Sequence, residues 1–121
     1  MNSRRQHKVA QLILETLSQV FQKNGSTYYG GAFVTITDVD VSPDLLVAKV
    51  YLSIYNVENK EDYIDRISSH AHEVRRLVGN SLKHSLKRIP EFLFYLDNSL
   101  DEALKIEGII KGENKSEPNE E

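Results

Sequence analysis

The feature that most constrains the fold is a run near the middle of the chain in which apolar and other residues alternate. One side of the run consists of Leu46, Ala48, Val50, Leu52 and Ile54. Because successive side chains of a strand point to opposite faces, this pattern predicts a strand with one face in a core and one in solvent. A sheet built on such a strand is covered on one side only.

Helical periodicity flanks this strand on both sides. Apolar residues recur every three or four positions at Ala10, Ile13, Leu14, Leu17, Val20 and Phe21. We expect a first helix from about Val9 that stops at Asn24-Gly25, where glycine readily takes a left-handed end. After the strand, Asn59 is the expected cap of a second helical stretch, whose apolar stripe runs from Ile64 to Ile89.

Two further strands are expected. The β-branched run at 33–37 continues to Val41 in the opposite alternation phase, which a bulge near Thr37-Asp38 would reconcile. Ser42-Pro43-Asp44 has the composition of a turn. Pro90 ends the helical stretch, and residues 92–96 form a last short strand.

The long helical stripe is interrupted by three weak helix formers, Gly79, Asn80 and Ser81. Glycine alone costs a helix about 1 kcal/mol relative to alanine. We therefore expect a kink at these residues, with Gly79 at a positive φ.

The end of the chain predicts a short helix and a tail. Ser99 and Glu102 have the spacing of a capping box for a helix that ends near Ile110. Residues 112–121 contain no apolar side chain, so they are expected to form a disordered acidic tail behind a domain at 1–111.

The order helix, strand, strand, kinked helix pair, strand is that of an α+β type II K-homology fold, a three-stranded sheet with helices on one face. Domains of that kind normally carry Gly-X-X-Gly at the junction of the helix pair, where it clamps a nucleic-acid backbone. At the predicted kink this chain has one glycine, in Gly79-Asn80-Ser81-Leu82. The usual clamp is therefore absent from this position.

Basic residues gather in two blocks, although the whole chain has a net charge of -3. The first block is Arg4, Arg5 and Lys8; the second is Arg75, Arg76, Lys83, Lys87 and Arg88. Residues 1–99 carry 12 Lys/Arg and 11 Asp/Glu, whereas residues 100–121 carry 3 and 7, so the acidity belongs to the last 22 residues. Since charges are screened within about 10 Å, a low overall charge does not exclude a polyanionic partner.

Several of these cations share one arc of a helical wheel, which holds Arg76, Asn80, Lys83, His84 and Lys87. Side chains at that spacing suit contacts to successive phosphates, so we predict RNA binding by this stripe and Arg88. Arg75 lies on the apolar side, where a structural role is expected. Arg4, Arg5 and Lys8 extend the RNA surface if the first helix starts beside the kink; otherwise they are ordinary solvated charges.

Several functional classes are disfavoured. The chain has no cysteine, its four histidines are dispersed, and it has neither a Ser-His-Asp order nor a glycine-rich phosphate loop. We expect no catalytic residue, no metal site and no cofactor. No apolar run is long enough to cross a bilayer, so we expect a cytoplasmic monomer that does not contact membranes.

Three segments, taken together, resemble the ribosome-binding factor A family. They are residues 5–9 (Arg-Gln-His-Lys-Val), residues 39–53 from Val39 through Ser42-Pro43-Asp44 to Ser53, and residues 86–99 from Leu86 through Pro90 to Ser99. The resemblance covers roughly Arg4 to Ile110. It implies a helix-kink-helix in place of the clamp, association with the small ribosomal subunit and its 16S ribosomal RNA, and a role in late maturation, including 5′-end processing and growth in the cold.

A second hypothesis is a protein-interaction adaptor that uses the open face of the sheet. Tyr51 and Tyr55 are predicted on that face, where they can stack on a base, contact a protein or pack across strands. On this reading the cationic stripe serves only solubility.

Overall fold

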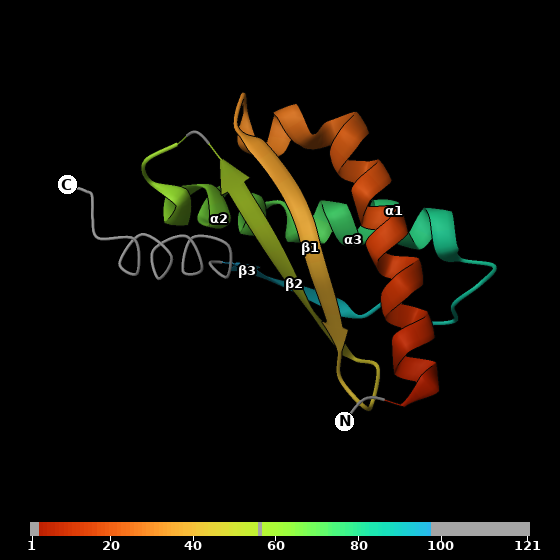
Figure 1. The fold of residues 1–121 in the computed structure, drawn as a ribbon. Coiled ribbons are helices and arrows are strands. Elements are labelled where there is room, and N and C mark those ends of the chain that lie inside the picture. The colour runs from red at the N-terminus through yellow and green to blue at the C-terminus, as the bar shows by residue number, and fades with distance from the viewer. Residues whose placement is uncertain (1–2, 56, 98–121) are drawn as a thin grey trace, which may run out of the picture.

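A computed structural model describes residues 3–55 and 57–97. Its elements are α1 (Arg4–Tyr29), β1 (Phe33–Val41), β2 (Val47–Tyr55), α2 (Lys60–Ser69), α3 (Ala71–Leu82) and β3 (Glu91–Leu96). The helices pack on one face of the three-stranded sheet, with α2 and α3 behind the strands and α1 beside β1 (Figure 1). This order confirms the predicted α+β fold. The predicted last helix and acidic tail lie outside the described residues.

The central strand is β2, which pairs with β1 in antiparallel and with β3 in parallel orientation. Its predicted core face is buried from Ala48 to Ile54, but Leu46 precedes the strand and is 42% exposed. The predicted bulge is confirmed by a register shift between Ile36 and Asp38. At the bulge, the Thr37 hydroxyl lies within hydrogen-bond distance of the carbonyl of Tyr51 and of the Asp97 carboxylate.

Helix α1 does not stop at Asn24-Gly25 as predicted; it continues to Tyr29 and ends at Gly30, whose φ is 64°. The reason is the burial of Tyr28, which is fully inaccessible and contacts the rings of Phe21 and His70. Burying a large aromatic side chain contributes about 1.5–3 kcal/mol, which outweighs the roughly 1 kcal/mol that Gly25 costs the helix. Tertiary packing therefore overrides the local stop.

The predicted kink at Gly79, Asn80 and Ser81 is wrong in position, because all three residues lie inside α3. The helix pair breaks instead at His70, whose φ of -101° and ψ of 10° separate α2 from α3. Asn59 is the N-cap of α2 as predicted, although its side chain makes no capping hydrogen bond. A helix-kink-helix is present, and the glycine has no part in the bend.

Helix α3 also ends earlier than the apolar stripe predicts, at Leu82 and not at Ile89. The N–H groups of Ser85 and Leu86 both bond to the Leu82 carbonyl, which closes one last turn beyond the end of the helix. Residues 83–90 then lead to β3, because β3 must start beside the start of β2 to pair with it in parallel. The cations that follow Leu82 therefore stand on a loop.

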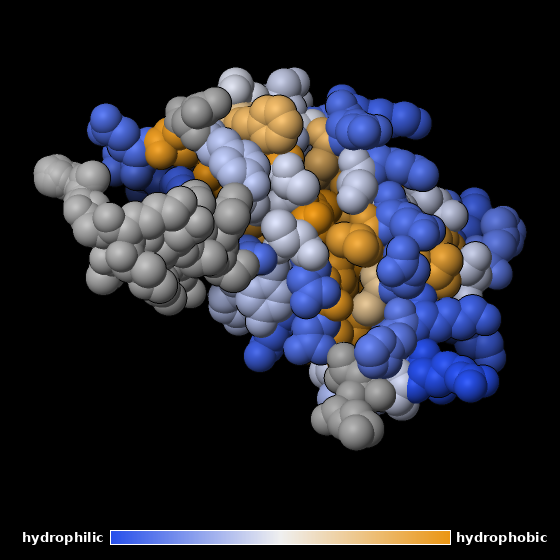
Figure 2. Space-filling view, viewed as in Figure 1, coloured by the Kyte–Doolittle hydropathy of each residue, from blue (hydrophilic) through white to orange (hydrophobic). Residues whose placement is uncertain are grey.

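Apolar side chains fill the space between the sheet and the helices. In Figure 2 they are visible along the line where β1 meets α1, with hydrophilic side chains over the outer surface of α1. Val34 and Ile36 on β1 and Leu14 on α1 pack there against the buried core. The same core anchors the first turns of α1 through Val9 and Ile13.

Replacing Gly79 with alanine is expected to stabilise the protein by up to about 1 kcal/mol. Gly79 is inside a helix, it does not have a positive φ, and a Cβ there would lie 3.5 Å from Ile89 Cγ1, an ordinary contact. The matched control is Gly25→Ala, which should destabilise because its Cβ would overlap the Tyr29 ring held over it. Thermal unfolding of both variants checks this pair; a loss of stability in Gly79→Ala would contradict it.

Candidate nucleic-acid interface

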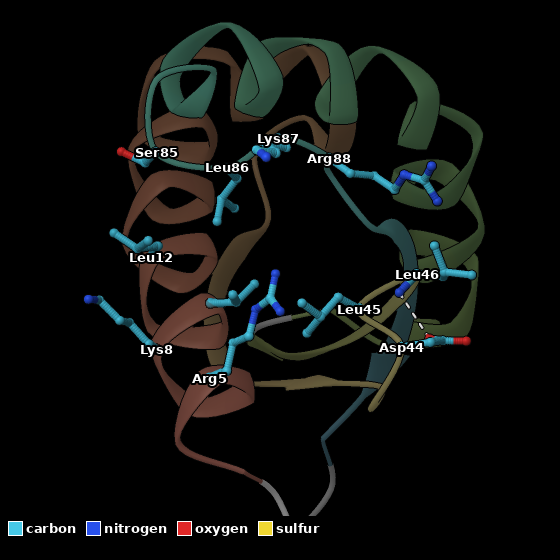
Figure 3. A pocket seen from close by; sticks show the side chains of 11 residues that line it. Arg5, Lys8, Leu12, Asp44, Leu45, Leu46, Ser85, Leu86, Lys87 and Arg88 are labelled. Carbon is cyan, nitrogen blue, oxygen red and sulfur yellow. Dashed lines mark hydrogen bonds between the residues drawn. The ribbon is translucent and has the colours of Figure 1, made fainter.

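Three segments from distant parts of the sequence enclose a hollow of about 570 Å³ (Figure 3). They are the start of α1, the turn between β1 and β2, and the loop between α3 and β3. Its cations are Arg5, Lys8, Lys87 and Arg88, and its apolar lining includes Leu12, Leu45 and Leu86. We call this feature the basic hollow.

The first turn of α1 is held in place by a capping box. The Ser3 hydroxyl accepts the N–H of Gln6 at 3.1 Å, and the Gln6 side chain accepts the N–H of Ser3 at 2.9 Å. The buried Gln6 amide also donates to the carbonyl of Val41, at the end of β1, at 2.8 Å. Arg5 and Lys8 therefore stand on an ordered helical turn that is tied to the sheet.

The turn between β1 and β2 forms the second side of the basic hollow. The Ser42 hydroxyl donates to Asp44 Oδ1 at 2.6 Å, and the same carboxylate oxygen accepts the N–H of Leu46 at 3.1 Å. Leu45 donates its N–H to the Ser42 carbonyl while holding a φ of 62°. These bonds confirm the predicted turn and fix the leucines that follow it.

The loop of residues 83–90 forms the third side. Arg75 donates through Nε and Nη2 to the carbonyl of Ile89, at 3.1 and 2.8 Å, so it has the structural role expected for it. One residue beyond Pro90, the N–H of Glu91 donates to the Leu46 carbonyl at 2.9 Å. The loop is therefore anchored at its end both to α3 and to the turn.

The charge in the basic hollow is strongly positive. Four cations face one acid among its lining residues, and that acid, Asp44, is already occupied as a hydrogen-bond acceptor. The hydroxyl of Ser42, followed by the N–H of Leu46, lowers the pKa of Asp44. The carboxylate keeps its negative charge, but four cations outnumber it, so the field of the basic hollow attracts anions.

The structure brings together only half of the predicted RNA-binding residues. Arg5, Lys8, Lys87 and Arg88 line the basic hollow, whereas the exposed side chains of Arg4, Asn80 and Lys83 do not. Arg76 lies near the far end of α1, where its charge opposes the rise in the pKa of Tyr28 that burial and the Glu73 carboxylate cause. The predicted stripe is not one helical face, because α3 ends at Leu82 and Lys87 stands on the loop beyond it. RNA binding by the predicted residues outside the hollow stays a prediction.

Comparison with known proteins places the chain among relatives over nearly its whole length. The sequence profile of ribosome-binding factor A matches residues 5–110. The chain is 41% identical over 110 residues to a ribosome-binding factor A of Cytophaga hutchinsonii, covering 91% of this chain and 83% of the relative. This chain belongs to the ribosome-binding factor A family. It is also 33% identical over 115 residues to the protein of Prosthecochloris aestuarii, covering 94% and 92%.

Solved structures of ribosome-binding factor A share the fold. A crystal structure of the Thermus thermophilus protein has a TM-score of 0.63 at 16% identity, covering 75% of this chain and 94% of the other. A homology model of the same species' protein, fitted into a cryo-EM map of a 30S complex, has a TM-score of 0.61 at 21% identity, covering 78% and 96%. At these identities the likeness shows the fold alone.

The leucines of the basic hollow are the residues that the sequence analysis did not predict. Leu45 and Leu46 are adjacent, so both cannot lie on the core face of one strand, and one of them had to be presented elsewhere. That doublet after a turn was the available signal. Leu86 gave no such signal, because its spacing continues the apolar stripe of the helix, although the helix itself ends at Leu82.

The open face of the sheet carries a second surface, made of aromatic side chains. Phe33 contacts Tyr55 edge-on at 5.8 Å, and the rings of Tyr51 and Tyr95 stack at 5.7 Å. Phe33 is 64% and Tyr95 41% exposed. Cross-strand packing therefore accounts for part of the tyrosine surface, as one of the sequence alternatives held, and the rest stays accessible.

Residues 3–55 and 57–97 contain no group of three or more His, Cys, Asp or Glu side chains that could hold a metal ion. No helix in the same ranges is long and apolar enough to cross a membrane.

The Asp44 carboxyl is expected to titrate below about 3.9, the ordinary value for aspartate. The pKa of Asp44 is lower in the folded protein than in the unfolded chain, so the ionised carboxylate stabilises the fold. This stabilisation is fully present above the pKa of the unfolded chain and is lost as the pH falls through the pKa of the folded protein. Ser42→Ala removes the hydroxyl that lowers the pKa of Asp44 most, so the pKa of Asp44 should rise towards the ordinary value of about 3.9. The variant should melt at a lower temperature than wild type at neutral pH, and the difference between the two melting temperatures should become smaller below about pH 4. NMR titration measures the shift, with Ser85→Ala as control; an unchanged pKa in Ser42→Ala would contradict the assignment.

Proposed function

We propose that this protein is a non-enzymatic assembly factor that binds the small ribosomal subunit through RNA contacts of the basic hollow. In this role it assists late maturation of 16S ribosomal RNA, including processing of the 5′ end, and it matters most in the cold. The observation that carries the proposal is the convergence of Arg5, Lys8, Lys87 and Arg88, from two basic blocks, on one anchored hollow.

The family supports the choice of partner. The Thermus thermophilus protein of the same family and fold was fitted into a map of a complex with the 30S subunit. The cations of the basic hollow suit phosphate groups, and such contacts give affinity and orientation with little sequence information. The protein then acts by binding one RNA conformation better than another, which shifts the population without any chemical step.

The proposal includes the setting in which the protein acts. We propose a cytoplasmic monomer that contacts neither membranes nor cofactors. Residues 1–111 form its ribosome-binding domain and residues 112–121 an acidic tail. On this proposal the protein binds 16S ribosomal RNA that is still immature, during assembly of the small subunit.

One observation favours a second candidate, a protein-binding role for the open sheet face. Phe33, Tyr55, Leu93 and Tyr95 are the exposed large apolar residues of that face. Contiguous apolar surface on a small protein often marks an interaction site. On this hypothesis binding depends on apolar burial and changes little with salt.

Removing two cations of the basic hollow, with Arg5→Gln and Lys87→Gln, should weaken binding to small subunits and flatten its salt dependence. Each lost phosphate contact reduces the slope of log affinity against log salt by about 1, so the double variant should lose about 2. Affinity measured by co-sedimentation with purified small subunits across salt concentrations gives both quantities.

The matched control removes the same charge elsewhere, with Lys23→Gln on α1 and Lys49→Gln on the open sheet face. This pair should keep most of the affinity and nearly the wild-type slope. Equal losses in both double variants would show a nonspecific charge effect. A shallow slope in wild type, with binding abolished by Tyr95→Ser, would favour the open face instead.

In cells that contain only the Arg5→Gln, Lys87→Gln protein, 16S ribosomal RNA with an unprocessed 5′ end should accumulate, and more strongly at low temperature. The reason is that weaker binding reduces the time for which the factor holds maturing RNA, and RNA structure is more persistent in the cold. Primer extension across the 5′ end measures the precursor, with the Lys23→Gln, Lys49→Gln strain beside it. Normal processing at every temperature would refute the maturation role.

A further inference from the structure

Leu45 has a backbone conformation that leucine rarely adopts. Its φ is 62°, and within residues 3–55 and 57–97 it is the only non-glycine residue with a positive φ. The left-handed conformation brings the Cβ of an ordinary residue too close to its own backbone, and such residues persist where the surroundings over-determine them. Here the hydrogen bonds of Ser42, Asp44 and Leu46 hold the turn on both sides of Leu45.

This conformation places an apolar side chain among cations. Figure 3 shows Leu45 beside Arg5, with Leu86 pointing into the same space from the opposite side. Leu45 and Leu86 are only partly buried, although both contact the core. The basic hollow therefore combines accessible aliphatic surface with a positive rim, a combination that phosphate binding alone does not require.

We propose that the basic hollow receives the base of one unpaired RNA nucleotide. This proposal rests on the proposed function and names the RNA feature that the site recognises. The base lies between Leu86 on one face and Leu45 with the planar guanidinium of Arg5 on the other, and the flanking phosphates meet Lys87 and Arg88. A base inside a duplex cannot enter, because both of its faces are already stacked.

The chemistry of the basic hollow selects this ligand over simpler ones. A free phosphate would use the cations and leave the leucines without a partner. An apolar protein side chain would cover the leucines and leave four cations without an anion. A nucleotide supplies both groups at once, and the volume of about 570 Å³ is within the range of roughly 300–1,000 Å³ typical of small-molecule sites.

The test combines a protein change with an RNA change. The RNA probes are a short single strand without self-complementarity, the same strand with its central nucleotides made abasic, and the blunt duplex of the same sequence. The protein variants are Leu45→Asn, because asparagine tolerates positive φ, and Leu45→Gly, because glycine adopts it freely. In both variants the lost packing lowers the free energy of unfolding while the relieved backbone strain raises it, so both should fold. Circular dichroism and thermal unfolding would check this.

Wild type should bind the intact strand about tenfold more tightly than the abasic strand, an effect near the lower part of the range for loss of one stacked base. In Leu45→Asn and Leu45→Gly the ratio of the affinities for the intact and the abasic strand should fall to about twofold or less, because the base no longer packs against the Leu45 side chain. The coupling between the two changes isolates the contact from general effects on affinity. Leu93→Asn, an equal change on the open sheet face, should keep the wild-type ratio.

The outcomes separate this inference from the proposed function. Equal ratios in wild type and both Leu45 variants, or duplex binding as tight as that of the single strand, overturn base insertion. Failure of wild type to bind either strand also overturns it. Subunit binding that persists with a steep salt slope in those cases leaves the proposed function standing, while its absence removes the proposed function itself.

Discussion

The structure depends on the pairing of β2 with a neighbour on each side while only one of its faces is covered. Antiparallel pairing with β1 needs only the turn at residues 42–46, but parallel pairing with β3 requires a crossover, which α2, α3 and the loop at 83–90 provide. Both connections reach the sheet at the start of β2, where Val47 pairs with Glu91. The topology itself therefore sets the leucines of the turn beside the cations of the loop.

The same constraint makes the basic hollow rigid. Its three sides are joined through backbone groups, since Gln6 reaches the carbonyl of Val41, Arg75 reaches that of Ile89, and Glu91 reaches that of Leu46. Each such bond contributes about 0.5–1.5 kcal/mol, enough together to hold a left-handed leucine in place. A site fixed in this way loses little conformational entropy when it binds, so more of its contact energy appears as affinity.

Sequence patterns predicted the fold where one local signal agreed with tertiary packing. Alternation from Ala48 to Ile54 and the phase change at the bulge both corresponded to the structure. Patterns failed where packing opposed the local signal: Tyr28 carried α1 past Gly25, and the start of β3 required the chain to leave α3 at Leu82. For the site, charge blocks identified its four cations. The Leu45-Leu46 doublet indicated that one leucine leaves the core face, but not that Leu45 would face these cations, because that depends on a backbone angle.

The two surfaces of the molecule differ in charge, and this difference suits them to different partners. Among the residues of the three strands, the open sheet face carries Asp38, Asp40 and Glu91 and one lysine, Lys49, so phosphates are disfavoured beside its aromatic rings. At the basic hollow four cations outnumber the one acid among the lining residues, Asp44. Because salt screens charges beyond about 8 Å, each surface acts through its local field and not through the net charge of the chain. This difference in local field supports the proposal that RNA contacts the basic hollow, while the open face suits a protein surface better than a phosphate.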